Sequence, residues 1–153
     1  MFGREKSPFG VIIKAAAEEA RQRGDRRMGT EHLLVGLLHH EPCAQALGVD
    51  AAAARAALEE LDRESLRMLG LEVGDDLPAR RPRRHPPIGG GSLTSNARAV
   101  VGHAVKHTTL RTRDKVGPAL VALALLDRKR PDPVAQLIDR LGIDRPAVRA
   151  RLA

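Results

Sequence analysis

Residues 29–40 have the sequence Gly-Thr-Glu-His-Leu-Leu-Val-Gly-Leu-Leu-His-His, an apolar run that starts with polar residues and ends with two imidazoles. The apolar side chains at 33–35 and 37–38 would cover nearly every face of a helix. Helices that are apolar all round are normally buried at the centre of a domain. This stretch therefore predicts a central helix, and the surrounding sequence has to supply the elements that bury it.

The sequence repeats this arrangement farther along the chain. At a shift of 88 residues, from position 33 to position 121, Leu33-Leu34-Val35 aligns with Val121-Ala122-Leu123. A preceding apolar stripe at helical spacing is also present in both copies. Its members are Phe9, Ile12, Ile13, Ala16, Ala17 and Ala20 in the first copy, and Ala97, Val100, Val101, Ala104 and Val105 in the second. Each copy is therefore expected to begin with an amphipathic helix that covers the central one.

The later part of each copy contains a helix stop followed by a helix start. Leu47-Gly48-Val49-Asp50 corresponds to Leu141-Gly142-Ile143-Asp144, with glycine ending one helix and aspartate capping the next. The shift has grown to 94 here, so the first copy is shorter before this point. We expect an all-α fold of two four-helix repeats, residues 1–73 and 93–153, in a pseudo-twofold eight-helix bundle. The third helix of the first repeat should be shortened.

Residues 74–92 are expected to link the two repeats. They contain Arg80-Arg81-Pro82-Arg83-Arg84 and a run of glycines, with almost nothing apolar to bury. We expect an exposed basic linker that limited proteolysis cuts first. The net charge of +7 leaves open a second interpretation, in which this arm touches phosphates.

The composition limits the location and the chemistry. The chain has 153 residues, of which 42% are hydrophobic, but it has no Trp or Tyr and a single cysteine, Cys43. No apolar run approaches the roughly 18–20 residues of a membrane span, and residues 1–6 carry no apolar leader. We expect a cytoplasmic protein without a membrane partner.

The residue types that carry catalysis or bind metals are present but poorly arranged. His32 and His39 are seven residues apart, too far to share an ion, and His103 and His107 have the correct spacing of four but no evident third ligand. Cys43 has no evident base, so we interpret it as a bystander thiol. The sequence also lacks a Gly-x-x-x-x-Gly-Lys-Ser/Thr phosphate loop. We therefore expect no catalytic residues, no metal, no cofactor and no ATP hydrolysis.

Three segments together carry a family resemblance. Met1-Phe2-Gly3-Arg4, Glu18-Glu19-Ala20 and Gly29-Thr30-Glu31-His32-Leu33-Leu34 resemble the Clp N-terminal domain, the double repeat at the head of ClpC and ClpA type AAA+ unfoldases. The resemblance implies a chaperone-related domain that receives substrates or adaptor proteins for the unfoldase and its partner peptidase. Because no ATPase module is evident, we expect a stand-alone, non-enzymatic interaction module, acting as an accessory or decoy in Clp-dependent proteolysis.

The resemblance also implies a ligand site. In some family members the glutamate of this motif binds the guanidinium of phosphoarginine, and a threonine at the start of the repeat's first helix holds the phosphate. The first repeat keeps Glu31 but has Lys6 and Ser7 near the threonine position, whereas the second keeps Thr94 but has Ala119 in place of glutamate. We expect the better site in the first repeat, formed by Glu31, Lys6 and Ser7. The alternative is that Thr30 and Glu31 only cap and start a helix.

A nucleic-acid-binding function is the remaining alternative. Residues 141–149 resemble the turn and second helix of a helix-turn-helix, and the isoelectric point is about 10.7. The same turn occurs twice within the repeats, however, and neither following helix is evidently a basic recognition helix. We expect only weak, salt-sensitive binding of nucleic acid through Arg80–Arg84.

Overall fold

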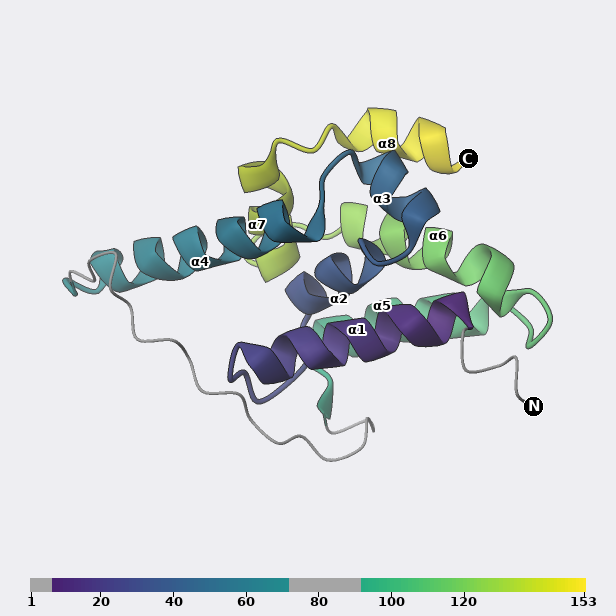
Figure 1. Ribbon diagram of the computed structural model, residues 1–153, viewed down its shortest axis with the longest axis horizontal. Coiled ribbons are helices and arrows are strands. Elements are labelled where there is room, and N and C mark those ends of the chain that lie inside the picture. Colours follow the sequence, from purple (N-terminus) through teal and green to yellow (C-terminus); the bar gives the residue numbers. More distant parts are fainter. Residues whose placement is uncertain (1–6, 72–91) are drawn as a thin grey trace.

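The computed structural model describes residues 7–71 and 92–153, which form eight α-helices and one isolated parallel bridge between Met28 and Leu93 (Figure 1). The all-α prediction is confirmed. The first repeat contributes α1 (Pro8–Gln22), α2 (Thr30–Leu37), α3 (Glu41–Leu47) and α4 (Ala51–Met68). The second contributes α5 (Ser95–Lys106), α6 (Arg113–Leu126), α7 (Pro133–Leu141) and α8 (Arg145–Leu152).

The ends of these helices follow the sequence signals. Ser7 caps α1 by accepting a hydrogen bond from the Gly10 amide, and Asp50 and Asp144 cap α4 and α8 in the same way. Gly48 and Gly142 end α3 and α7 at φ values of 73° and 67°, a left-handed conformation that favours glycine. The stop-and-start signals of the sequence therefore act locally as predicted.

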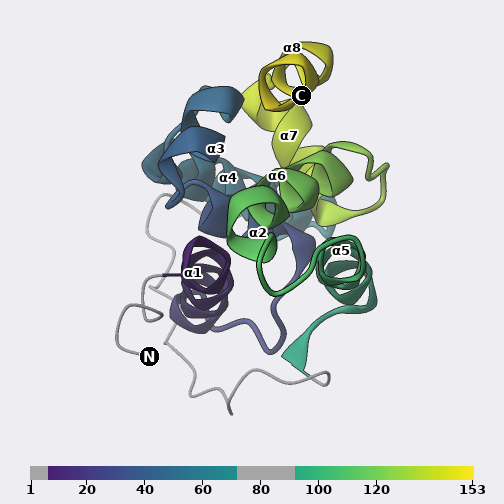
Figure 2. The same cartoon turned by 90° about the vertical axis from the view of Figure 1, so that its right-hand side faces the viewer.

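The two central helices form the middle of the core. Figure 2 shows α2 and α6 together at the centre, with α1 and α5 on one side and α3, α4, α7 and α8 on the other. Leu33 and Leu37 of α2 and Val121 and Leu125 of α6 are completely buried. The apolar run that begins at Leu33 is thus the buried centre that its composition predicts.

Helices of one repeat pack against helices of the other in pairs that are related by the pseudo-twofold symmetry. Helix α4 packs against α7, and the pseudo-equivalent pair α3 and α8 also pack together, while α1 contacts α6 and α2 contacts α5. Arg140 of α7 binds Glu60 and Glu64 of α4, and Arg151 of α8 donates to the Ala46 carbonyl of α3 at 2.8 Å. The repeats therefore interlock, an arrangement that the sequence repeat alone did not indicate.

The repeats also differ in the lengths of their helices. Helix α3 has 7 residues and α7 has 9, which agrees with the expected shortening. Helix α6 begins at Arg113, earlier than the Pro118 position that aligns with the start of α2. Thr109 and Thr112 exchange backbone and side-chain hydrogen bonds just before it, and this turn starts the helix early. Pro118 consequently lies inside α6.

Several expectations concern residues outside the described ranges. Lys6, the basic run Arg80–Arg84 and nearly all of the expected linker fall there, so the division of the chain at 74–92 and its early proteolysis stay predictions. Ser92, the last residue of that segment, is described, and its carbonyl accepts a hydrogen bond from the Met28 amide at 2.8 Å. Among the described helices, none is long and apolar enough to cross a membrane.

Candidate functional site

The start of α2 is organised by a buried histidine. His32 accepts a hydrogen bond from the Gly29 amide at its Nδ1 atom, at 2.8 Å, and its Nε2 atom lies 2.8 Å from Asp25. Because Nδ1 is an acceptor, the ring proton lies on Nε2 and is donated to the carboxylate. Asp25 also pairs with Arg23, which reaches Asp62 on α4 at 2.6 Å. His32 therefore connects the start of α2 to the loop that follows α1.

Thr30 has a different role from the helix cap that the sequence suggested. Gly29 occupies the N-cap position of α2, and Thr30 is the first helical residue. The Thr30 hydroxyl donates to Asp132, a buried carboxylate that caps α7 and binds Arg128 at 2.8 Å. Thr30 and Asp132 are only 1% and 4% exposed. Thr30 is thus a contact between the repeats and is not available to a ligand.

Glu31 remains accessible at the start of α2. Its carboxylate lies over Gly29, where any added Cβ atom would collide with it, and about a fifth of the side chain is exposed (21%). A carboxylate in the first turn interacts favourably with the positive end of the helix. The side chain is therefore partly exposed at the start of α2.

Thr94 lies at the same end of the molecule as Glu31. It caps α5, and its hydroxyl accepts from the Ala97 amide at 3.1 Å. Its own amide donates to the Met28 carbonyl at 3.0 Å, and Met28 is two residues before α2. The start of α5 is thereby fastened beside the start of α2, which places Thr94 in the neighbourhood of Glu31.

Ser7 lies at the opposite end of the first repeat. Its hydroxyl donates to Asp114 in the first turn of α6, and the Phe9 amide approaches the same carboxylate at 3.4 Å. Helices α1 and α2 are antiparallel, because Gly36 near the end of α2 lies against Ile12, whereas His32 at its start binds Asp25 beyond the end of α1. From the 1.5 Å rise per residue, Ser7 and Glu31 are roughly 15–20 Å apart.

The structure does not bring Ser7 and Glu31 of the first repeat together. Thr94, not Ser7, lies beside the start of α2, while Ser7 lies beside the start of α6, the helix that contains Ala119. The physical reason is that antiparallel helices within a repeat separate their starts, and the interlocking of the repeats brings starts from different repeats together. Lys6 is outside the described residues.

The two ends also differ in charge. In the alignment of the repeats at a shift of 88 residues, Asp114 corresponds to Arg26. The second repeat therefore has an acidic residue where the first has an arginine. Asp114 occupies the start of α1, whereas Arg26 and Arg27 are exposed just before Met28 at the other end. Sequence reasoning missed this pair, although the 88-residue alignment contains it. The end of the molecule that contains Thr94 therefore carries exposed arginines, whereas the end that contains Ser7 carries a carboxylate.

The other reactive side chains lie elsewhere. Cys43 is 2% exposed, and burial raises the pKa of its thiol to about 11, so the nucleophilic thiolate is disfavoured at neutral pH. Burial also lowers the pKa of His40. The rings of His103 and His107 are 4.4 Å apart between centroids. Within the described parts of the chain, no three His, Cys, Asp or Glu side chains converge as a metal site would require.

The fold is that of a double-repeat helical domain. The chain belongs to the Clp repeat (R) N-terminal domain family, whose model matches residues 7–137. This family is a helical, non-catalytic domain that mediates protein interactions in Clp systems.

Two relatives illustrate the similarity. The ATP-dependent Clp protease ATP-binding subunit ClpA homolog of Cyanidium caldarium is 22% identical over 99% of this chain. The chaperone protein ClpC3, chloroplastic, of Oryza sativa subsp. japonica is 26% identical over 90% of it. The matched regions span only 16% and 13% of those two proteins, so the similarity concerns one domain of much longer chains.

Proposed function

We propose that this chain is a non-enzymatic protein-interaction module that acts as an accessory or a decoy in Clp-dependent proteolysis. The observation that carries the proposal is the interlocked double repeat, matched over residues 7–137 to a family that mediates protein interactions in Clp systems. Its partners would be a Clp unfoldase or peptidase, an adaptor, or a tagged substrate, in the cytoplasm.

We further propose that the ligand site of this module lies between Glu31 and Thr94. The Thr94 hydroxyl, the first amides of α5 and the nearby Arg26 would hold a phosphate, and the Glu31 carboxylate would pair with a guanidinium. Phosphoarginine contains both groups. Four observations support this placement. The Thr94 amide is hydrogen-bonded to Met28, and the Glu31 side chain is partly exposed. Arg26 is exposed, and the Asp114 carboxylate lies at the opposite end, beside Ser7.

The corresponding end of the molecule, which contains Ser7, is a poorer candidate. The carboxylate of Asp114 already accepts from Ser7 at the start of α1, and Ala119 cannot bind a guanidinium. A phosphate at this end would be repelled by the Asp114 carboxylate. It would also compete with that carboxylate for the amides at the start of α1. We therefore propose one ligand site per chain instead of two, with Ser7 outside it.

Affinity capture with the whole chain as bait tests the proposed partners. We expect Clp unfoldase or peptidase subunits to be retained, and Glu31→Ala to reduce retention of any partner that docks through the site. Ser7→Ala is the matched control at the other end. Degradation of a model substrate by a reconstituted Clp protease then separates the roles, since an accessory accelerates it and a decoy slows it. No retention and no change in rate would refute the proposal.

The nucleic-acid alternative has less support. The arginines of α8 bind within the chain: Arg145 to Asp139 at 2.9 Å, Arg149 to Asp127, and Arg151 to the Ala46 carbonyl. A recognition helix needs its side chains available for base edges. We propose only weak, nonspecific contact with nucleic acid.

A further inference from the structure

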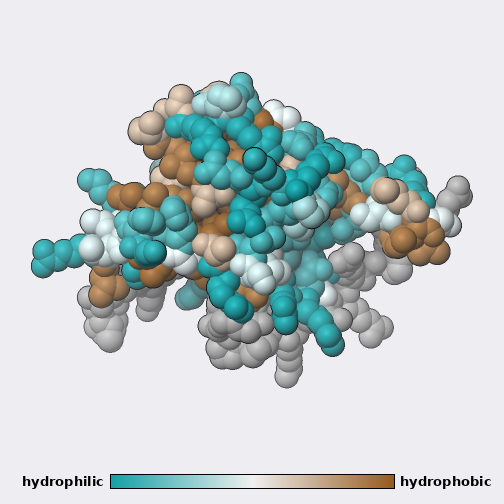
Figure 3. Space-filling model, turned by 180° about the vertical axis from the view of Figure 1, so that it is seen from behind, coloured by the Kyte–Doolittle hydropathy of each residue, from teal (hydrophilic) through white to brown (hydrophobic). Residues whose placement is uncertain are grey.

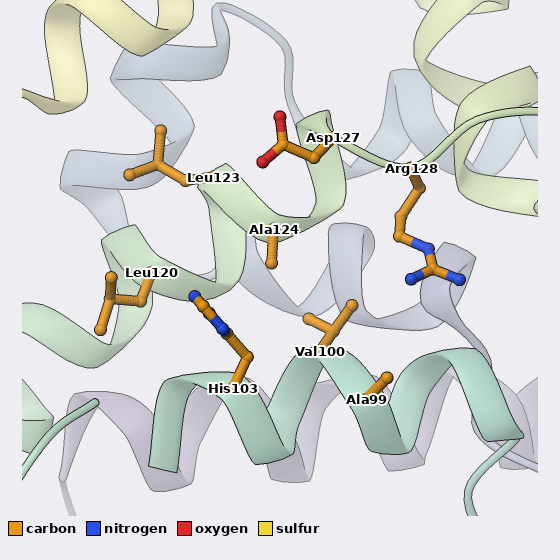
Figure 4. A pocket seen from close by; sticks show the side chains of 8 residues that line it. All are labelled: Ala99, Val100, His103, Leu120, Leu123, Ala124, Asp127 and Arg128. Carbon is orange, nitrogen blue, oxygen red and sulfur yellow. The ribbon is translucent and has the colours of Figure 1, made fainter. Parts of the chain in front are cut away.

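A groove lies between α5 and α6, away from Glu31 and Thr94. Its volume is about 350 Å³, and it is lined by Ala99, Val100, His103, Leu120, Leu123, Ala124, Asp127 and Arg128. Figure 4 shows Val100 and Ala124 facing each other across it, while His103 points from α5 toward α6. Seen from behind, apolar side chains gather over α5 and α6 among hydrophilic ones (Figure 3). The groove is therefore mostly apolar.

A single sequence difference between the repeats explains why this groove is open. In the first repeat, α1 packs tightly on α2 because Gly36 has no side chain: an added Cβ atom would lie 2.5 Å from the Ile12 carbonyl oxygen. The residue at the corresponding position of the second repeat is Ala124. Its methyl group prevents an equally close approach of α5 to α6. The space that remains is the groove.

The groove continues into a basic hollow. A second cavity of about 410 Å³ shares Asp127 and Arg128 with it and extends between the α6–α7 loop, α7 and α8. Its charged lining consists of Arg128, Lys129, Arg130, Arg145 and Arg149, against two carboxylates, Asp127 and Asp139.

Positive charge remains in this hollow after internal pairing. Asp139 lies between two guanidinium groups, 2.9 Å from Arg145 and 3.3 Å from Arg130, and these hydrogen bonds lower its pKa. Arg149 pairs with Asp127, and Arg128 with the nearby Asp132. Because one carboxylate serves two arginines, and the Arg130 side chain is 68% exposed, the hollow attracts negative charge.

We infer that this continuous surface, the apolar groove followed by the basic hollow, binds a protein segment with an apolar anchor and an acidic tail. Leu120 of α6 and Asp127, the C-cap residue of that helix, are seven residues apart, or about 10 Å at 1.5 Å per residue. An extended chain covers that distance in about three residues. The acidic side chains should therefore begin about three to five residues after the anchor. The inference rests on the proposed docking function but uses different residues from the Glu31–Thr94 site.

Fluorescence anisotropy with the whole chain tests this inference. The probe is a labelled peptide with a Leu-Leu pair, a Gly-Ser-Gly spacer and a Glu-Glu-Glu-Glu tail. We expect it to bind, with an affinity that falls as salt rises because exposed charges are screened. A peptide with Lys in place of Glu should bind at least about tenfold more weakly, and so should a peptide with Ser in place of Leu.

Variants test each half of the surface. Ala99→Glu places a carboxylate beside the groove and should weaken binding about tenfold or more, whereas Ala52→Glu, the same change at an exposed position of α4, should not. Lys129→Gln with Arg130→Gln should reduce the affinity and its salt dependence, whereas Lys14→Gln with Arg67→Gln, which removes equal charge elsewhere, should not. Circular dichroism confirms that each variant is folded.

Three results would overturn the inference. They are failure of the leucine peptide to bind, equal binding of the serine peptide, and equal effects of matched and control variants. If a duplex oligonucleotide displaced the probe and bound Ala99→Glu as well as the wild type, the hollow would be a site for nucleic acid. None of these results depends on a Clp partner or on phosphoarginine, so this inference and the proposed function fail separately.

Discussion

The hydroxyl of Thr30 in α2 donates a hydrogen bond to the carboxylate of Asp132, which caps α7, and both groups are buried between the repeats. Asp132 also binds Arg128, whose other guanidinium nitrogen reaches Asn96 of α5 at 2.5 Å. Asp132 and Arg128 together therefore connect the central helix of the first repeat to α5 and α7 of the second.

Replacement of Thr30 by valine should destabilise the fold. Valine has nearly the same shape but leaves the buried Asp132 carboxylate without this donor, and a hydrogen bond to a charged group contributes about 1.5–3 kcal/mol. Urea denaturation should show a loss of that order in the free energy of unfolding. Thr30→Ser keeps the hydroxyl and should lose clearly less. Equal stability of the valine variant and the wild type would show that this contact does not hold the repeats together.

Two glycine-to-alanine changes should have opposite effects. At Gly36 the new methyl group would lie 2.5 Å from the Ile12 carbonyl oxygen, so α1 must move away, and such overpacking costs about 1–3 kcal/mol. At Gly102, in the interior of α5, an added Cβ atom would meet no atom within 4 Å apart from its chain neighbours and the backbone of its own helix, and alanine should stabilise the helix by about 0.5–1 kcal/mol. Thermal unfolding of both variants measures the difference. A stabilised Gly36→Ala would contradict the close packing that distinguishes the first repeat from the second.

The sequence predicted much of this fold because its strongest signals are local. The caps at Ser7, Asp50 and Asp144 and the glycine stops at Gly48 and Gly142 depend only on neighbouring residues. The apolar stripes likewise determine which face of each helix is buried, whatever helix lies opposite.

The contacts between repeats were not predictable in the same way. A repeat alignment does not say whether α4 packs on its own third helix or on the third helix of the other copy. The sequence therefore placed Glu31 with Ser7, whereas antiparallel packing of α1 and α2 separates them. The roles of Asp114 and Asp132 were not predicted for the same reason, because both residues bind side chains of the first repeat. Asp114 binds Ser7, and Asp132 binds Thr30.

Alkaline pH should weaken the fold through Cys43. Burial raises the pKa of this thiol from 9.0 to about 11, so the native state keeps its proton after the unfolded state has lost it. The contribution to stability is complete below pH 9 and declines as the pH rises from there toward 11. Urea denaturation between pH 8 and 11 should show this decline, reduced in Cys43→Ala. At pH 8, iodoacetamide should react slowly with the native chain and readily with the unfolded one. Fast alkylation of the folded protein would contradict the burial of Cys43.

The proposed ligand site gives the sharpest test of the pairing across repeats. Calorimetric titration of phosphoarginine into the chain should give one site per molecule. At the opposite end, the Asp114 carboxylate already binds Ser7 where a second phosphate would lie. Glu31→Ala removes the partner of the guanidinium, and Thr94→Ala removes a hydroxyl that faces the phosphate. Loss of a group that bonds to a charge typically costs about 1.5–3 kcal/mol, so each variant should lose tenfold or more in affinity. Ser7→Ala should leave the affinity nearly unchanged.

Each outcome of that titration has a distinct meaning. If Ser7→Ala reduced the affinity and Thr94→Ala did not, the ligand would lie at the start of α1, contrary to the contact between Thr94 and Met28 on which the site rests. Two equivalent sites would show that the Asp114 carboxylate is displaced by phosphate. An absence of heat with the wild type would leave Glu31 as an acid that only stabilises the start of α2. Docking of proteins would survive that last result, because the groove between α5 and α6 recognises its partner through other residues.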